Sequence, residues 1–183
     1  MGILLLASTF ALAACNPGGL GASRDTPFAP GLRKNGHAVD QLLVGHRLMQ
    51  AGEHELALQA FTRAAGDQGL TVDTLSALGS ANLGLGRLGQ AEHLLRRAIK
   101  TDEAIPETWN NLGVVLMERG QYTEAEQVFR RAFALDNGES VSIRDNLRLA
   151  LAKSENPDYG ENQEQDYKLV RRGSSDFLIR QIP

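Results

Sequence analysis

Cys15 is the residue best placed to do chemistry, because it is the single cysteine of the chain and cannot form an internal disulfide. It follows an uncharged, mostly apolar run, residues 2–14, which is too short to cross a bilayer and has the length of a secretory signal. The small residues Ala13 and Ala14 before it would let a peptidase take the backbone in an extended form. The thiolate of Cys15 is a nucleophile that could accept a lipid.

The sequence Leu12-Ala13-Ala14-Cys15 resembles the lipobox of bacterial lipoproteins. The resemblance implies cleavage before Cys15, a diacylglycerol on its thiol, and stable anchoring by several acyl chains. Asn16, and not Asp, follows the cysteine, which by the sorting rule of these lipoproteins implies the periplasmic face of the outer membrane. No Lys or Arg precedes the apolar run, so an ordinary secretory signal, a buried N-terminal helix or a later-than-true start codon stays open.

The N-terminal organisation follows from this motif. Residues 1–14 are predicted to be a lipoprotein signal peptide. Residues 15–37 are rich in Gly and Pro and show no periodic apolar face, which predicts a lipidated flexible tether. Its expected use is reach, because it would hold the following domain away from the membrane surface.

Other residue types that could support catalysis or bind a metal form no recognisable set in the sequence. The histidines are His37, His46, His54 and His93, and no second cysteine or spaced carboxylates complete a metal site. No Ser-His-Asp combination lies on a nucleophile elbow, and the Gly-rich segments lack the Lys-Ser/Thr of a phosphate loop. A net charge of −3 with mixed signs argues against nucleic acid. We expect no catalytic residue, metal, cofactor or small-molecule substrate.

A repeat of 34 residues organises the middle of the chain. Stepping back by this length from Gly113 reaches Gly79 and then Gly45, and the same step relates four further positions. Those positions carry Gly120, Ala125, Phe129 and Ala132, then Gly86, Ala91, Leu95 and Ala98, then Gly52, Ala57, Phe61 and Ala64. Apolar residues at helical spacing on both sides of each turn predict a helical hairpin, which needs stacked neighbours to bury its face. Each glycine of the first helix is expected to face the repeated alanine of the second.

The period, with Trp109-x2-Leu112-Gly113 and then Ala125-x3-Phe129, resembles the tetratricopeptide repeat. The resemblance implies an all-α solenoid of three helical hairpins over residues 38–139. It also implies a closing helix over residues 140–153, which gives the last hairpin a polar outer side. Pro106 is expected to open the first helix of the third repeat, where its missing N–H costs nothing.

The remaining C-terminal residues, 154–183, show no helical pattern. Their first part is polar and acidic, which predicts a linker. The two apolar segments that flank Gly173-Ser174-Ser175 predict a possible β-hairpin. An isolated hairpin is only marginally stable in water, so this one would be docked on the solenoid, paired with a partner, or disordered.

By resemblance to the family, the first helix of each hairpin lines a concave groove that would bind protein partners. Register places nine residues in it: Leu42, His46, Met49, Ser76, Ser80, Leu83, Asn110, Val114 and Met117. Co-chaperone members of the family clamp a C-terminal carboxylate with Lys, Arg and Asn, which the matching positions here do not hold. A helical or extended peptide is the expected ligand instead. Leu42 and Leu83 could equally belong to the core.

The short lipobox, the Gly/Pro tether and the repeats together resemble the Tad (tight-adherence) pilus assembly lipoproteins. That resemblance implies a non-enzymatic outer-membrane scaffold whose partner is a secretin or another pilus-assembly component. Two alternatives stay open. One is a repeat lipoprotein of another envelope pathway, such as outer-membrane protein insertion or cell-wall synthesis, and the other is a regulator of a periplasmic enzyme.

Overall fold

The repeated sequence folds as stacked helical hairpins in a computed structural model, which describes residues 39–101, 104–155, 167–172 and 176–181. The predicted signal peptide, Cys15 and the predicted tether lie outside these residues. The described residues contain seven helices and two strands: α1 Gln41–Gln50, α2 His54–Gln68, α3 Val72–Gly84, α4 Leu88–Ala98, α5 Pro106–Glu118, α6 Tyr122–Leu135, α7 Val141–Glu155, β1 Tyr167–Arg172 and β2 Asp176–Gln181.

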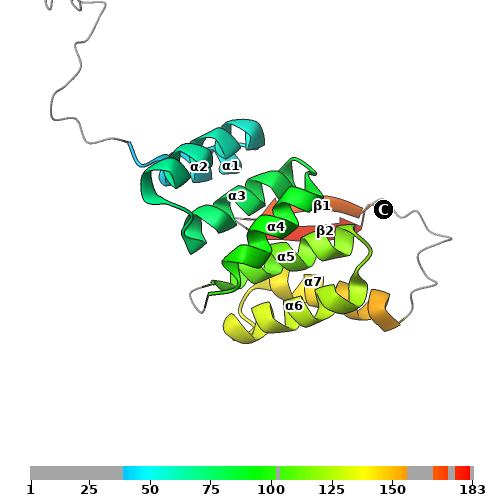
Figure 1. Cartoon of the computed structure of the whole chain (residues 1–183). Coiled ribbons are helices and arrows are strands. Elements are labelled where there is room, and N and C mark those ends of the chain that lie inside the picture. Colours follow the sequence, from blue (N-terminus) through cyan, green and yellow to red (C-terminus); the bar gives the residue numbers. More distant parts are fainter. Residues whose placement is uncertain (1–38, 102–103, 156–166, 173–175, 182–183) are drawn as a thin grey trace, which may run out of the picture. The chain divides into compact units, whose positions relative to one another are not determined.

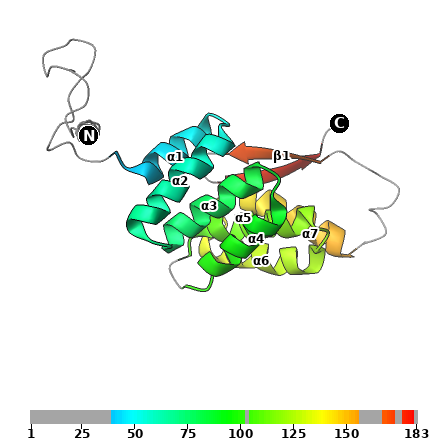
Figure 2. The same cartoon turned by 45° about the horizontal axis from the view of Figure 1, so that its top comes forward.

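The first helices of the hairpins form the inner layer of the stack. Helix α1 contacts α3, α3 contacts α5, and α5 contacts α7, while α2, α4 and α6 each pair with the helices before and after them in the chain. Figures 1 and 2 show this progression from α1 and α2 at one end to α6 and α7 at the other. Helix α7 therefore occupies the place of a fourth first helix, so it closes the inner layer as well as the end of the array.

Short turns of one kind join the helices within each hairpin. Gly52, Gly86 and Gly120 have φ values of 79°, 69° and 73°, in the left-handed region that favours glycine. Their spacing in the sequence is that of the repeat, so the turn is copied with the helices. Pro106 is the first residue of α5, as the sequence predicts.

The glycines of the inner helices allow close packing, and the side chain nearest to each is one that the sequence analysis did not name. A Cβ added at Gly79 would lie 2.6 Å from Leu95 Cγ, and one at Gly113 would lie 2.5 Å from Phe129 Cε1. Gly45 meets the ring of Phe61 in the same way. The neighbour of each glycine is thus the large residue four positions after the repeated alanine. The repeated alanines are fully buried, and the expectation that they face the glycines stays a prediction.

Gly113→Ala should therefore destabilise the protein by about 1–3 kcal/mol, because the added methyl group overlaps the Phe129 ring. Gly89→Ala, on α4, is the matched control, since its nearest neighbour is an Arg119 nitrogen at 4.0 Å. That change should stabilise by about 0.5 kcal/mol, because alanine is the better helix former. Urea unfolding of both variants measures the difference, and equal effects at the two sites would contradict the packing argument.

Strands β1 and β2 form an antiparallel hairpin that is docked on the helices. Leu169 is paired with Ile179, and Arg171 with Phe177. Strand β2 packs against α5 and α7, and the side chains of Phe177 and Ile179 join the main hydrophobic core. Figure 2 shows the hairpin beside the helices, with β1 on its outer side. The sequence left open whether this hairpin is docked on the solenoid, paired with a partner or disordered, and in the structure it is docked.

No helix within the described part of the chain is both long enough and apolar enough to span a membrane.

Candidate binding groove

The nine predicted groove residues lie on the inner helices α1, α3 and α5, but they do not line an open surface. Three of them are half-buried: Leu42, His46 and Ser76. The other six are buried: Met49, Ser80, Leu83, Asn110, Val114 and Met117. Leu83 belongs to the hydrophobic core together with Met49, Val114 and Met117. The sequence left groove and core open for Leu83, and the structure places it in the core.

The α1 end of the inner layer carries one titratable group. The His46 ring meets the Phe61 ring edge-on, with 5.2 Å between the ring centroids. Burial lowers the pKa of His46, and the negative charges of Asp73 and Asp40 partly oppose that shift. The neutral imidazole is therefore favoured at neutral pH, and this side chain acts as a packing group and not as a cation.

A polar seam joins α3 to α5. The hydroxyl of Ser76 contacts that of Thr108, and Asn111 donates a hydrogen bond of 2.9 Å from Nδ2 to Ser80 Oγ. Ser80 in turn donates to the carbonyl oxygen of Ser76 at 2.9 Å. The polar atoms of Ser76 and Ser80 are thus used between helices, where they satisfy buried partners and fix the register of the two repeats. They are not left free for a ligand.

Asn110 on α5 and Asn146 on α7 bind strand β2, and we call this pair the asparagine clamp. Asn146 Nδ2 donates to the carbonyl oxygen of Phe177 at 2.7 Å, and its Oδ1 accepts from the backbone N–H of Ile179 at 3.0 Å. Asn110 Nδ2 donates to the same Phe177 oxygen at 3.0 Å. The two amides are joined by a bond of 2.9 Å from Asn146 Nδ2 to Asn110 Oδ1.

The asparagine clamp is fully satisfied by this arrangement. Both side chains are 0% exposed, so neither amide has water as an alternative partner. Asn110 Nδ2 also donates to Asp176 Oδ1, so both hydrogens of each amide nitrogen are used. The Phe177 oxygen accepts two hydrogen bonds, which fills both of its lone pairs. Asn146 therefore holds the outer edge of β2 as a neighbouring strand would.

Asp176 is the charged residue of this site. Its pKa is raised from 3.8 to about 6, chiefly by burial. The negative charges of Glu107 and Asp136 add to the rise, while hydrogen bonds from Ser142 and from the backbone of Phe177 oppose it. Arg172 lies opposite Asp176 in the hairpin register. The docked strand therefore keeps a partly buried carboxylate at neutral pH, and this weakens its binding.

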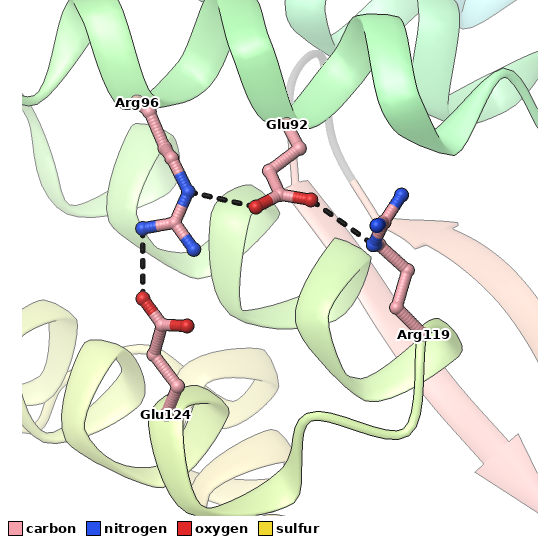
Figure 3. Close-up of polar contacts among 4 residues, drawn as sticks. All are labelled: Glu92, Arg96, Arg119 and Glu124. Carbon is pink, nitrogen blue, oxygen red and sulfur yellow. Dashed lines mark hydrogen bonds and ion pairs between the residues drawn. The ribbon is translucent and has the colours of Figure 1, made fainter.

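The outer helices carry a charge network instead, shown in Figure 3. Arg96 on α4 contacts Glu92 at 2.8 Å and Glu124 on α6 at 2.7 Å, and Arg119, after α5, contacts Glu92 at 3.0 Å. The hydrogen bond from Arg96 lowers the pKa of Glu124. This network joins the second and third hairpins on the side of the outer helices, and it has no catalytic geometry.

Among the residues that the structure describes, no three His, Cys, Asp or Glu side chains are grouped as a metal site would require. His46, His54 and His93 lie on α1, α2 and α4. On the inner helices the structure brings together amides and hydroxyls, and two of the amides bind the backbone of strand β2.

Asn146 is the functional residue that sequence reasoning misses. One signal could have found it. The dipeptide Asn146-Leu147 repeats Asn111-Leu112 at a spacing close to the repeat length, which marks α7 as a copy of a first helix. The interaction with β2 has no such signal, because the strand has no counterpart elsewhere in the chain.

Residues 76–140 match the family model described as tetratricopeptide repeat. Three solved structures show the same fold. The Sgt2 TPR domain of Aspergillus fumigatus matches with a TM-score of 0.61 and 21% identity, over 79% of this chain and 99% of that one. The second TPR domain of human RPAP3, solved with an HSP70 peptide, matches with a TM-score of 0.55 and 21% identity, over 62% of this chain and 94% of that one. A mutant O-GlcNAc transferase of Thermobaculum terrenum matches with a TM-score of 0.57 and 26% identity, over 61% of this chain and 21% of that one. The predicted all-α solenoid is confirmed.

Proposed function

We propose that this tetratricopeptide-repeat protein is a non-enzymatic scaffold, lipid-anchored in the bacterial envelope, that binds protein partners through its inner helices. The observation that carries the anchor is the motif Leu12-Ala13-Ala14-Cys15 ahead of the solenoid. The observation that supports the scaffold is an inner face whose asparagine side chains bind the extended backbone of the protein's own strand β2. The RPAP3 domain with the same fold was solved with a peptide, which is consistent with such a role.

The finer proposal is a role in Tad-type pilus assembly at the outer membrane. It rests on the order of segments in the sequence: a short lipobox, a Gly/Pro-rich stretch and three repeats. The partner would then be a secretin or another pilus-assembly component. Cross-linking in intact cells, followed by purification of the native protein from envelope extracts, tests this. Recovery of a secretin supports it, and recovery of partners from another envelope pathway only would reject the pilus role.

The anchor has its own prediction. Cys15→Ala removes the thiol that would take the lipid, so nearly all of the protein should leave the membrane fraction. Asn16→Asp keeps the thiol and should leave the protein membrane-bound but retained in the inner membrane, if the sorting rule applies. Fractionation with immunodetection reads both. Membrane association that survives Cys15→Ala would show that the lipobox interpretation is wrong.

Met117, although predicted to line the groove, is not a suitable position for a variant that tests partner binding. Met117 is 7% exposed and lies in the hydrophobic core, so a charge there would unfold the solenoid before it could report on a ligand. Variants of the docked strand are the better probes.

A further inference from the structure

Strand β2 is held by contacts that any extended polypeptide could make. Three of the four hydrogen bonds between the asparagine clamp and β2 end on backbone atoms, the Phe177 oxygen and the Ile179 N–H. A backbone oxygen and the N–H two residues later point the same way only in an extended strand. The asparagine clamp therefore recognises strand conformation, and it is largely indifferent to side-chain identity.

The side chains of β2 add a defined pattern. Phe177 and Ile179 are on the face toward the helices and are 2% and 8% exposed, within the main core. Leu178 lies on the other face and is also buried, whereas Arg180 is exposed. The residue before the aromatic ring, Asp176, must accept a hydrogen bond from Asn110 in a partly buried place.

The occupant that the chain supplies is not the best one for this site. A neutral hydrogen-bond acceptor in the place of Asp176 would keep the contact with Asn110 and avoid burying a negative charge near Glu107 and Asp136. An empty site is also unfavourable, because it would expose to water the apolar surface that Phe177 and Ile179 cover. The site therefore favours exchange of one strand for another over opening.

We infer that the asparagine clamp and the apolar surface beside it are a receptor for an extended segment of a partner protein, with the pattern neutral polar, aromatic, apolar, aliphatic. Strand β2 is the chain's own competing ligand, which such a segment displaces. This inference rests on the proposed scaffold function and names the class of partner segment that the inner helices bind. It also makes partner binding conditional on release of the hairpin.

The test uses the full chain and a fluorescent peptide of residues 174–183 that carries Asp176→Asn. In the chain itself, Phe177→Asp with Ile179→Asp removes the competing strand. This variant should bind the peptide at least about 10-fold more tightly than the wild type, because an attached hairpin competes at an effective concentration in the millimolar range. Adding Asn146→Ala to the variant should abolish binding. A peptide with Phe177→Asp and Ile179→Asp is the control and should not bind.

Circular dichroism must show that the double variant keeps its helices. A folded double variant that ignores the peptide, or binds it equally well without Asn146, overturns the inference. If the double variant does not fold, the wild type is titrated with the peptide to millimolar concentration while exchange of the Ile179 amide is followed. Loss of protection supports displacement, and unchanged protection overturns it. Failure here leaves the envelope purification intact, so the two proposals can fail separately.

Discussion

Asn146→Ala is expected to release the β-hairpin from the helices and to lower the free energy of unfolding by about 3–5 kcal/mol. The substitution removes bonds to Asn110, Phe177 and Ile179. It leaves the Ile179 N–H and Asn110 Oδ1 without their partner, while the Phe177 oxygen keeps only its bond from Asn110. Each buried polar group left without a partner costs about 1–3 kcal/mol. A hairpin of this size is only marginally stable in water, so undocking should also unfold it.

Urea unfolding measures the total, and amide exchange of Phe177 and Ile179 separates undocking from global unfolding. The matched control is Asn82→Ala, since Asn82 is also buried and helical but bonds only to Leu78 of its own helix. Its loss should cost about 1 kcal/mol and leave the hairpin protected. Equal behaviour of the two variants would contradict the role given to Asn146.

Asp176→Asn is expected to stabilise the protein at neutral pH by up to about 3 kcal/mol, and to flatten its stability profile between pH 4 and pH 7. The pKa of Asp176 is about 6 in the folded protein, against an ordinary value of 3.8 for an exposed aspartate. A carboxyl with a raised folded pKa binds its proton more tightly in the folded state. Its contribution is therefore most favourable below pH 4, and it is lost as the pH rises through 6. At 1.36 kcal/mol per pKa unit, the difference between a pKa of about 6 and one of 3.8 sets the upper limit of the stabilisation.

The measurement is the free energy of unfolding at several pH values for the wild type and the variant. Only the wild type should lose stability between pH 4 and pH 7 from this source. His46 acts in the opposite direction, because its lowered folded pKa costs stability as the pH falls below 6.5. It is present in both proteins, so it cancels in the difference between the two curves. Parallel curves would show that Asp176 keeps an ordinary pKa in the folded protein.

The sequence predicts the solenoid well because the residues that pack the helices together recur in each of the three repeats. The spacing of Gly45, Gly79 and Gly113 indicates close approach between helices, and the structure places a large side chain against each of them. The prediction named the repeated alanine as the partner, and it did not include the large side chain that comes nearest to each glycine. The alanine and the large residue lie on the second helix four positions apart, on one face, and periodicity alone cannot say which of them reaches the glycine.

The binding surface is harder to predict, because helix register says which side a residue faces and not what covers that side. Asn110 lies on the inner helices as predicted, yet its partners are Asp176 and Phe177, more than 60 residues later in the chain. Ser76 and Ser80 face the same layer but bond to the neighbouring inner helix. A contact between a repeated helix and a strand that occurs once produces no periodic pattern in the sequence. The sequence therefore predicts the helix and the strand separately, but not the contact between them.

The docked strand changes how stability is distributed along the solenoid. In a linear array each repeat touches only its neighbours, so both ends fray and the terminal helix is the first to peel away. Here one strand contacts both α5 and α7, so the last helix is fastened from two directions. The array is closed at one end and open at the other, where α1 has no helix before it among the described residues. Loss of order should therefore travel one way, from α1 toward α7, and the polypeptide receptor sits at the end that is reached last.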